Sequence, residues 1–184
     1  MDWTELAGRA ASGDHRAVAE LVRAVQGDIW RYCAAFVGRA DAEDVAQDAL
    51  LRIVRNVEHY RREGSGRAWV LTITRRACVD HIRAQVRRRS MLERVARLDD
   101  TAHPGGPEAD RGLSELADVL GALDVERRHA FVLTQVLGLS YAEAAAVSHC
   151  PVGTIRSRVA RARLQLLEAL RPTALGADRC GGEP

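Results

Sequence analysis

Residues 138–167 read GLSYAEAAAVSHCPVGTIRSRVARARLQLL and have the pattern of a helix-turn-helix. Ser140, followed three positions later by Glu143, forms a capping box that predicts a short helix over residues 141–147. A polar break follows, and Pro151 then has the fixed φ that is favoured at the first position of a new helix. We therefore expect two helices joined by a tight turn.

The second helix of this pair combines an apolar stripe with an arginine-rich outer surface. Ile155, Val159 and Ala162 recur at helical spacing and are predicted to pack inward. The other faces carry Thr154, Arg156, Ser157, Arg158, Arg161 and Arg163. A helix that enters the major groove of DNA needs arginines for guanine edges and phosphates, and short hydroxylated residues near its start. A solvated face normally mixes both signs of charge, whereas residues 151–164 carry four arginines and no acid, which favours DNA binding.

The composition is typical of a helical protein. Its 184 residues leave room for one ordinary domain or two small ones, and 47% hydrophobic residues can build an ample core. Only 4% of the residues are aromatic, so alanine, valine and leucine must fill that core, which favours helices over sheets. All 27 basic residues are arginine, which we attribute to codon use in a GC-rich genome.

Several classes of chemistry find no support in the sequence. The four cysteines (Cys33, Cys78, Cys150 and Cys180) form no C-x-x-C pair, and there is no catalytic triad or phosphate-loop motif. We therefore expect no metal, no cofactor and no enzymatic activity. There is no run of roughly 18 apolar residues, and Asp2, Glu5 and Arg9 interrupt any signal peptide, so we expect a cytoplasmic protein without membrane insertion.

Charge is segregated along the chain. Residues 1–58 contain ten acids and seven arginines, and residues 75–97 contain eight arginines and two acids. Residues 98–126 then contain eight acids and one arginine, before the basic helix of the helix-turn-helix. Two basic surfaces separated by an acidic connector predict two DNA-binding modules with a linker that avoids DNA.

The first module opens with two predicted helices. Residues 15–37 have an amphipathic pattern, and Asp41 is predicted to cap a second helix. Its predicted buried stripe is Val45, Ala49, Ile53 and Val57, and its opposite face carries Asp44, Gln47, Asp48, Leu51 and Arg55. Leu51 is apolar within a polar face, which hints at a partner surface, although a single exposed leucine is common.

A third helix is predicted to start at Ala68, after a loop at residues 63–66. It carries Arg76, Asp80, Arg83 and Arg87 on one stripe, and Asp80 is expected to pair with Arg76 and Arg83. Tyr60 and Trp69 flank the loop, an arrangement suited to holding unstacked bases, but a core position for Trp69 is equally open.

Three motifs in this order resemble the extracytoplasmic-function (ECF) sigma factors, the compact two-domain branch of the sigma-70 family. They are ADAEDVAQDALLRIVRN (40–56), RAWVLTITRRACVDHIRAQ (67–85) and GLSYAEAAAVSHCPVGTIRSRVARAR (138–163). The resemblance covers roughly residues 15–170, and its last motif is most similar to the sigma C-type subgroup. It implies a protein that directs core RNA polymerase to specific promoters and promotes promoter melting.

The resemblance also implies an architecture and partners. The fold would be all-α, with a region 2-like domain (1–90), a flexible acidic linker (91–114), a region 4-like helix-turn-helix domain of four helices (115–171) and a tail (172–184). The partners would be promoter DNA and the beta and beta-prime subunits of core RNA polymerase. Two points stay open: whether an anti-sigma factor binds, and whether the free protein packs its two domains together and covers the basic helices.

Site residues follow from the same resemblance. The polymerase contacts would be Asp44, Gln47, Asp48, Leu51 and Arg55. The -10 element would be read by Arg61, Arg62, Arg67, Trp69, Arg76, Asp80, Arg83 and Arg87, and the -35 element by Thr154, Arg156, Ser157, Arg158 and Arg161. A stand-alone helix-turn-helix regulator is the alternative, but it leaves the acidic helix unexplained.

Overall fold

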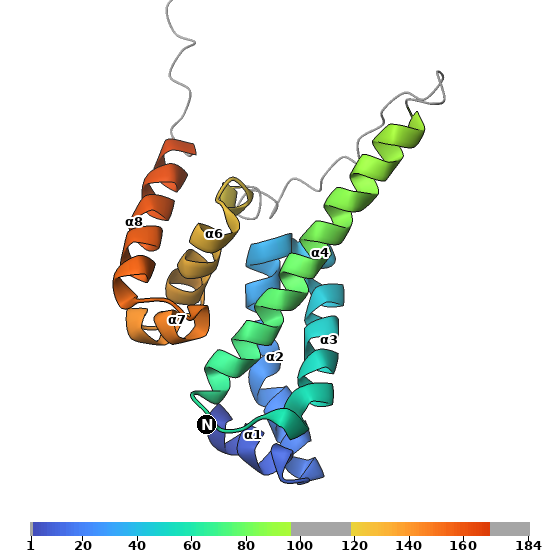
Figure 1. Ribbon diagram of the computed structural model, residues 1–184, viewed down its shortest axis with the longest axis vertical. Coiled ribbons are helices and arrows are strands. Elements are labelled where there is room, and N and C mark those ends of the chain that lie inside the picture. Colours follow the sequence, from blue (N-terminus) through green and yellow to red (C-terminus); the bar gives the residue numbers. More distant parts are fainter. Residues whose placement is uncertain (1, 97–118, 170–184) are drawn as a thin grey trace, which may run out of the picture.

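The computed structural model describes residues 2–96 and 119–169, and every regular element in those ranges is helical (Figure 1). In chain order these are α1 (Trp3–Ala11), α2 (His15–Val37), α3 (Arg39–Asn56), the 3-10 turn η1 (Val57–His59), α4 (Gly66–Ala96), α6 (Val125–Phe131), the π-helical turn η2 (Val132–Val136), α7 (Tyr141–Ser148) and α8 (Val152–Ala169). The all-α prediction is confirmed. Residues 97–114 of the predicted linker and the whole predicted tail lie outside the described residues.

The first domain is a bundle in which α2 packs against α1, α3 and α4. Asp14 caps α2 by accepting hydrogen bonds from the backbone N–H groups of Arg16 (3.0 Å) and Ala17 (3.1 Å). The prediction of a helix over residues 15–37 is therefore confirmed. The predicted apolar stripe of α3 is also confirmed, because Val45, Ala49, Ile53 and Val57 are all buried.

Helix boundaries in this domain differ from the prediction at two places. Gly38, with φ 87°, ends α2 and allows α3 to begin at Arg39, so Asp41 lies in the first turn of α3 instead of capping it. Helix α4 begins at Gly66, two residues before the predicted Ala68. The sequence analysis did not predict α1, whose buried residues contact the bundle.

The second domain contains the predicted helix-turn-helix. The Ser140 hydroxyl accepts a hydrogen bond from the Glu143 N–H (3.2 Å), and the Glu143 carboxylate accepts one from the Ser140 N–H (2.8 Å). The capping box is therefore confirmed. His149, with φ 49°, ends α7, and the Pro151 carbonyl accepts from the Thr154 N–H (2.9 Å). Pro151 thus precedes α8 as its cap, one position earlier than predicted.

The apolar face of α8 holds the second domain together. Ile155, Val159 and Ala162 are all buried, as their spacing predicts. They belong to the side of α8 that packs against α6 and α7. The arginine-rich side of α8 is thereby fixed on the outside of the domain.

The two domains lie against each other. Helix α7 contacts α4, and η2 contacts α2, while α8 lies on the far side of α6 from α4 (Figure 1). In this structure the two domains are packed together. How much of each basic surface this packing covers is therefore the central question for the site.

Candidate nucleic-acid interface

The outer surface of α8 is largely open. Arg156, Ser157 and Arg161 are exposed, and Thr154 is half-buried. Among the described residues, no carboxylate lies within ion-pair distance of Arg156 or Arg161. Arg158 differs, because its guanidinium pairs with the Glu126 carboxylate at 3.1 Å. Four of the five predicted -35 residues therefore share one accessible face, and Arg158 is held by its own domain.

The basic stripe of α4 is exposed, but its predicted ion pairing is wrong. Asp80 pairs with Arg52 of α3 at 2.7 Å and with neither Arg76 nor Arg83. The reason is that α3 packs alongside α4 and brings Arg52 between Asp80 and Asp48, the latter at 2.9 Å. These two hydrogen-bonded carboxylates raise the pKa of Arg52. Arg76 and Arg83 are left exposed on α4 with their charges uncompensated by Asp80.

The loop before α4 presents both exposed and anchored groups. Arg61 and Arg62 are exposed, whereas Tyr60 is buried. Trp69 is half-buried, and its ring lies 5.2 Å from that of Tyr60, measured between centroids. Trp69 therefore combines the two predicted roles: part of its ring packs against the core, and part stays accessible to solvent. The accessible part of Trp69, beside exposed arginines, is suited to stacking an unpaired base.

Among the residues predicted to read the -10 element, Arg67 is the one that the second domain contacts directly. Its guanidinium donates to the Asp28 carboxylate (3.1 Å) and to the Leu137 carbonyl of the second domain (3.1 Å). Arg87 stands at the other extreme, because it is exposed far along α4. The predicted -10 set is thus spread along α4 and the loop, and only its first part is engaged by the other domain.

The exposed face of α3 is a ridge with a groove on each side. Asp44, Gln47 and Arg55 are exposed, and the Leu51 side chain is 50% exposed. Asp48 is half-buried because it pairs with Arg52. The predicted exposure of Leu51 is therefore confirmed, and Val54, which is 40% exposed, is a second apolar residue on the surface of α3.

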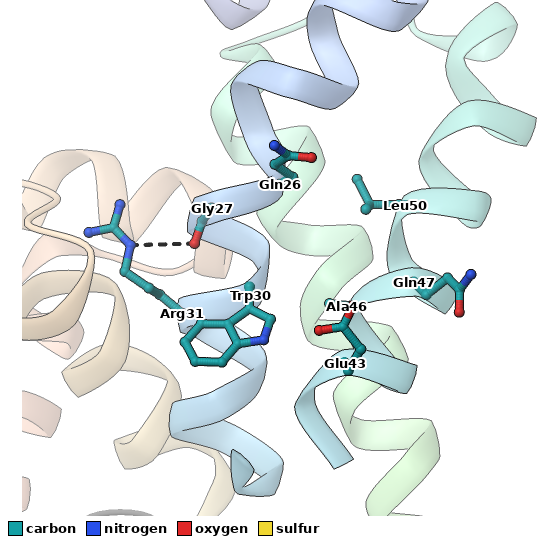
Figure 2. Close-up of a pocket in the computed structure, with 8 residues that line it drawn as sticks. All are labelled: Gln26, Gly27, Trp30, Arg31, Glu43, Ala46, Gln47 and Leu50. Carbon is teal, nitrogen blue, oxygen red and sulfur yellow. Dashed lines mark hydrogen bonds between the residues drawn. The ribbon is translucent and has the colours of Figure 1, made fainter. Parts of the chain in front are cut away.

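The groove between α2 and α3 is the larger of the two, with a volume of about 580 Å³ (Figure 2). Trp30 forms one wall from α2, and Gln47 and Leu50 form the other from α3. The second groove, of about 370 Å³ between α3 and α4, is lined mainly by charged residues that include Asp44, Asp48 and Arg87. The sequence patterns did not identify Trp30, because nothing in the spacing of α2 shows that its indole stays partly accessible, with the Arg39 guanidinium over the ring at 5.4 Å from its centroid.

Both domains match families of known proteins. Residues 21–88 match the Sigma-70 region 2 family and residues 113–166 match the Sigma-70, region 4 family. The chain is also 43% identical over 176 residues to the ECF RNA polymerase sigma factor SigC of Mycobacterium tuberculosis, covering 94% of this chain and 93% of that one. The chain is an ECF sigma factor of the sigma-70 family. As a sigma factor it is a subunit that binds core RNA polymerase, and it is not an enzyme.

Another sigma factor and two solved structures are also similar to this chain over most of its length. The ECF RNA polymerase sigma-E factor of Escherichia coli K12 is 29% identical over 178 residues, covering 91% of this chain and 93% of that one. Among solved structures, CnrH in complex with the cytosolic domain of CnrY has a TM-score of 0.69 at 30% identity, covering 91% of this chain and 96% of that one. RpoE in complex with the anti-sigma factor NepR, from Bartonella quintana, has a TM-score of 0.60 at 27% identity, covering 88% and 98%. The match across both domains excludes the stand-alone regulator, which would account for residues 138–167 alone.

The domains of this sigma factor meet at a buried polar contact. The Tyr32 hydroxyl of α2 and Nδ1 of His129 in α6 lie 2.7 Å apart, and both side chains are fully buried. Burial, together with the charges of Arg75 and Arg158, lowers the pKa of His129 to about 3. Burial also raises the pKa of Tyr32 well above its usual range. Both groups are therefore neutral at pH 7.

Charged contacts surround this pair. Arg128 donates from Nη1 to the Phe36 carbonyl (2.8 Å) and lies over the Phe36 ring at 5.3 Å from its centroid. Glu126 of the second domain pairs with Arg75 of α4 as well as with Arg158 of α8. Sequence patterns could not have found these contacts, because they depend on how the two domains of the sigma factor meet.

No described residues form a metal site: no group of three or more His, Cys, Asp or Glu side chains is close enough to hold an ion. Cys33 and Cys78 are buried free thiols whose sulfur atoms lie 3.7 Å apart. The contact with Cys33 and burial raise the pKa of the Cys78 thiol, so it remains protonated and unreactive. None of the described helices is long and apolar enough to cross a membrane.

Proposed function

We propose that this sigma factor recognises a promoter through two separate surfaces, one on each domain. The exposed face of α8 would enter the major groove of the -35 element, with Arg156, Ser157 and Arg161 nearest the base edges. The observation that carries this proposal is the open, arginine-rich side of α8, where no described carboxylate pairs with Arg156 or Arg161. Thr154 and Arg158 would complete the reader, Arg158 only after it exchanges Glu126 for DNA.

The -10 element would be read by the loop at residues 61–67 and by α4. Trp69 would stack on an unpaired base of the melted strand, while Arg61 and Arg62 hold its phosphates. Farther along, Arg76, Arg83 and Arg87 would follow the backbone, with Asp80 fixing Arg52 instead of touching DNA. Arg67 would become available once its contact with Leu137 is released.

The ridge of α3 would contact core RNA polymerase. Asp44, Gln47, Asp48, Leu51 and Arg55 would face the beta-prime subunit, and the groove beside them supplies an apolar floor that includes Leu50. The second domain would then face the beta subunit. Residues 1–90 and 115–171 would act as the two recognition domains, with residues 91–114 as the linker and 172–184 as a tail. The protein would work in the cytoplasm.

An anti-sigma factor is a further candidate partner. The two solved structures described above are both complexes, one with the anti-sigma factor NepR and one with the cytosolic domain of CnrY. A comparable partner of this chain would stabilise the same packed arrangement of domains or compete for the α3 ridge.

Transcription with purified core polymerase and a promoter library tests the proposal. Transcripts that depend on the full chain and share two upstream elements would support it, and their absence would contradict it. Within that assay, Arg156→Ala should weaken selection of the -35 element by about 1–3 kcal/mol while leaving the -10 preference unchanged. Arg163→Ala is the matched control on the same helix, because the Arg163 guanidinium already bonds to Gln135 (2.8 Å).

A further inference from the structure

Helix α1 lies outside the segment that matches the region 2 family, which begins at residue 21. It nevertheless packs against α2, α4 and η1, and its N-terminal end meets the loop that connects η1 to α4. That loop is the one assigned above to the -10 element, so the inference developed here rests on the proposed function. The question is what α1 does for the loop.

One end of the loop is fixed by a hydrogen bond that it donates to α1. The Thr4 hydroxyl accepts from the Gly66 N–H at 3.0 Å, and Gly66 is the first residue of α4. The approach is close: a Cβ added at Gly66 would lie 2.6 Å from the carbonyl carbon and oxygen of Trp3. Only glycine fits here, because the atoms that it meets belong to the backbone of α1.

The middle of the loop is held by a second contact. Gly8 of α1 is buried under the Arg62 guanidinium, and a Cβ at Gly8 would lie 2.0 Å from Arg62 Nε. Arg62 itself has φ 55°, a left-handed conformation that is unusual for a residue with a side chain. The absence of a side chain at Gly8 therefore leaves space for the guanidinium of Arg62, whose backbone is strained.

Aromatic and cationic contacts complete the frame. The Tyr60 hydroxyl donates to the Gly64 carbonyl across the loop (3.0 Å), and Gly64 has φ 100°. Arg67 lies over the Trp3 ring, 5.5 Å from its centroid. The two ends and the centre of the loop are thus tied either to each other or to α1.

We propose that α1 is a positioning element that presets the loop at residues 60–65 and the start of α4 for the -10 strand, with Thr4 and Gly8 as its positioning residues. A loop that is already ordered loses less conformational entropy when it captures an unpaired base. Neither Thr4 nor Gly8 needs to touch DNA. They act on selection of the -10 element through the loop, and not on the -35 element or on polymerase.

The test uses the full chain assembled with core polymerase. Thr4→Val removes the acceptor at nearly constant shape, and Thr4→Ser restores it. Gly8→Ala displaces the Arg62 guanidinium, and Glu5→Ala changes an exposed residue of the same helix as a control. For each variant, we would measure open-complex formation on promoters with preferred and substituted -10 sequences, -35 selection, core-polymerase affinity and the midpoint of thermal unfolding.

Thr4→Val and Gly8→Ala are each expected to reduce -10 discrimination by about three- to tenfold, with unchanged -35 selection and polymerase affinity. Thr4→Ser and Glu5→Ala should behave like the parent. Unchanged -10 discrimination in both variants would overturn the inference, and so would an equal loss at both promoter elements, which would mark α1 as merely structural. Arg61→Ala separates this failure from failure of the proposed function, because Arg61 lies in the loop itself, and an unchanged -10 preference in that variant would remove the loop from the reader.

Discussion

The two arginine-rich helices differ in how much of their surface the packed protein leaves open. On α8, Arg156 and Arg161 are exposed and have no described carboxylate partner. On the first turns of α4, the second domain binds Arg67 through the Leu137 carbonyl and Arg75 through Glu126. The contrast teaches that the surface proposed for the -35 element is accessible in the packed chain, whereas full use of the surface proposed for the -10 element requires the domains to separate.

Removing the histidine at the domain interface should make the first turns of α4 as accessible as the outer side of α8. His129→Ala deletes a fully buried ring and leaves the Tyr32 hydroxyl without its partner. We expect the packed arrangement to lose about 2–4 kcal/mol, and the first turns of α4 to become accessible. Small-angle scattering of the free chain should change to an extended, two-lobed profile. His59→Ala, an exposed position on η1, is the control, and an unchanged compact profile for His129→Ala would contradict the expectation.

Acidification should open the same interface by a smaller amount. The pKa of His129 is about 3 in the packed arrangement, whereas an exposed histidine titrates near pH 6.5. Separated domains therefore take up a proton as the pH falls below about 6.5, and the packed form does not until about pH 3. Packing is fully stable above this window and weakens as the pH falls through it, by about 2 kcal/mol at pH 5.

Fluorescence energy transfer between labels on α4 and α8 would follow this titration. The transfer efficiency should fall as the pH is lowered from about 7.5 to about 5. His129→Gln cannot be protonated, so its transfer efficiency should depend much less on pH. If the dependence persisted in that variant, a different group would be responsible.

The smallest expected effect acts on the second domain alone. Ser140→Ala removes the side-chain half of the capping box that starts α7, and should lower the free energy of unfolding by about 1 kcal/mol. Calorimetry or chemical denaturation measures this loss, with Ser90→Ala on the exposed surface of α4 as the control. Because the change leaves α4 intact, a weakened -10 preference in Ser140→Ala would show that the two surfaces are less independent than the structure indicates.

Local patterns were enough to predict most of the helices. The capping box at Ser140 and the apolar spacing of α3 and α8 are each determined within about one to five turns of chain, so sequence alone predicted them. The predicted helix boundaries were wrong at two glycines. Gly38 adopts a positive φ, and Gly66 lies so close to the backbone of α1 that a Cβ would not fit. Motifs also led to the correct family, because its two regions occur in a specific order.

Contacts between distant segments could not be predicted in this way. Asp80 was assigned to arginines on its own helix, but the neighbouring helix supplies Arg52 instead. The Tyr32–His129 pair joins residues 97 positions apart, and no periodicity marks either of them. Such contacts depend on tertiary packing, and the periodicity of a single helix does not show which residues of another helix will lie against it.

The sharing of Glu126 has a consequence for how this sigma factor meets nucleic acid. Its carboxylate binds Arg75 from one domain and Arg158 from the other, and all three side chains are partly exposed. A DNA phosphate that binds Arg75 competes directly with Glu126 across the domain interface, so binding of a polyanion there is thermodynamically linked to opening, whereas the Glu126–Arg158 pair lies within the second domain. The same linkage makes the packed form sensitive to ionic strength, since salt screens Glu126 and phosphate alike. Non-specific DNA must meet the opening cost with phosphate contacts alone, whereas a cognate promoter adds base contacts to offset it.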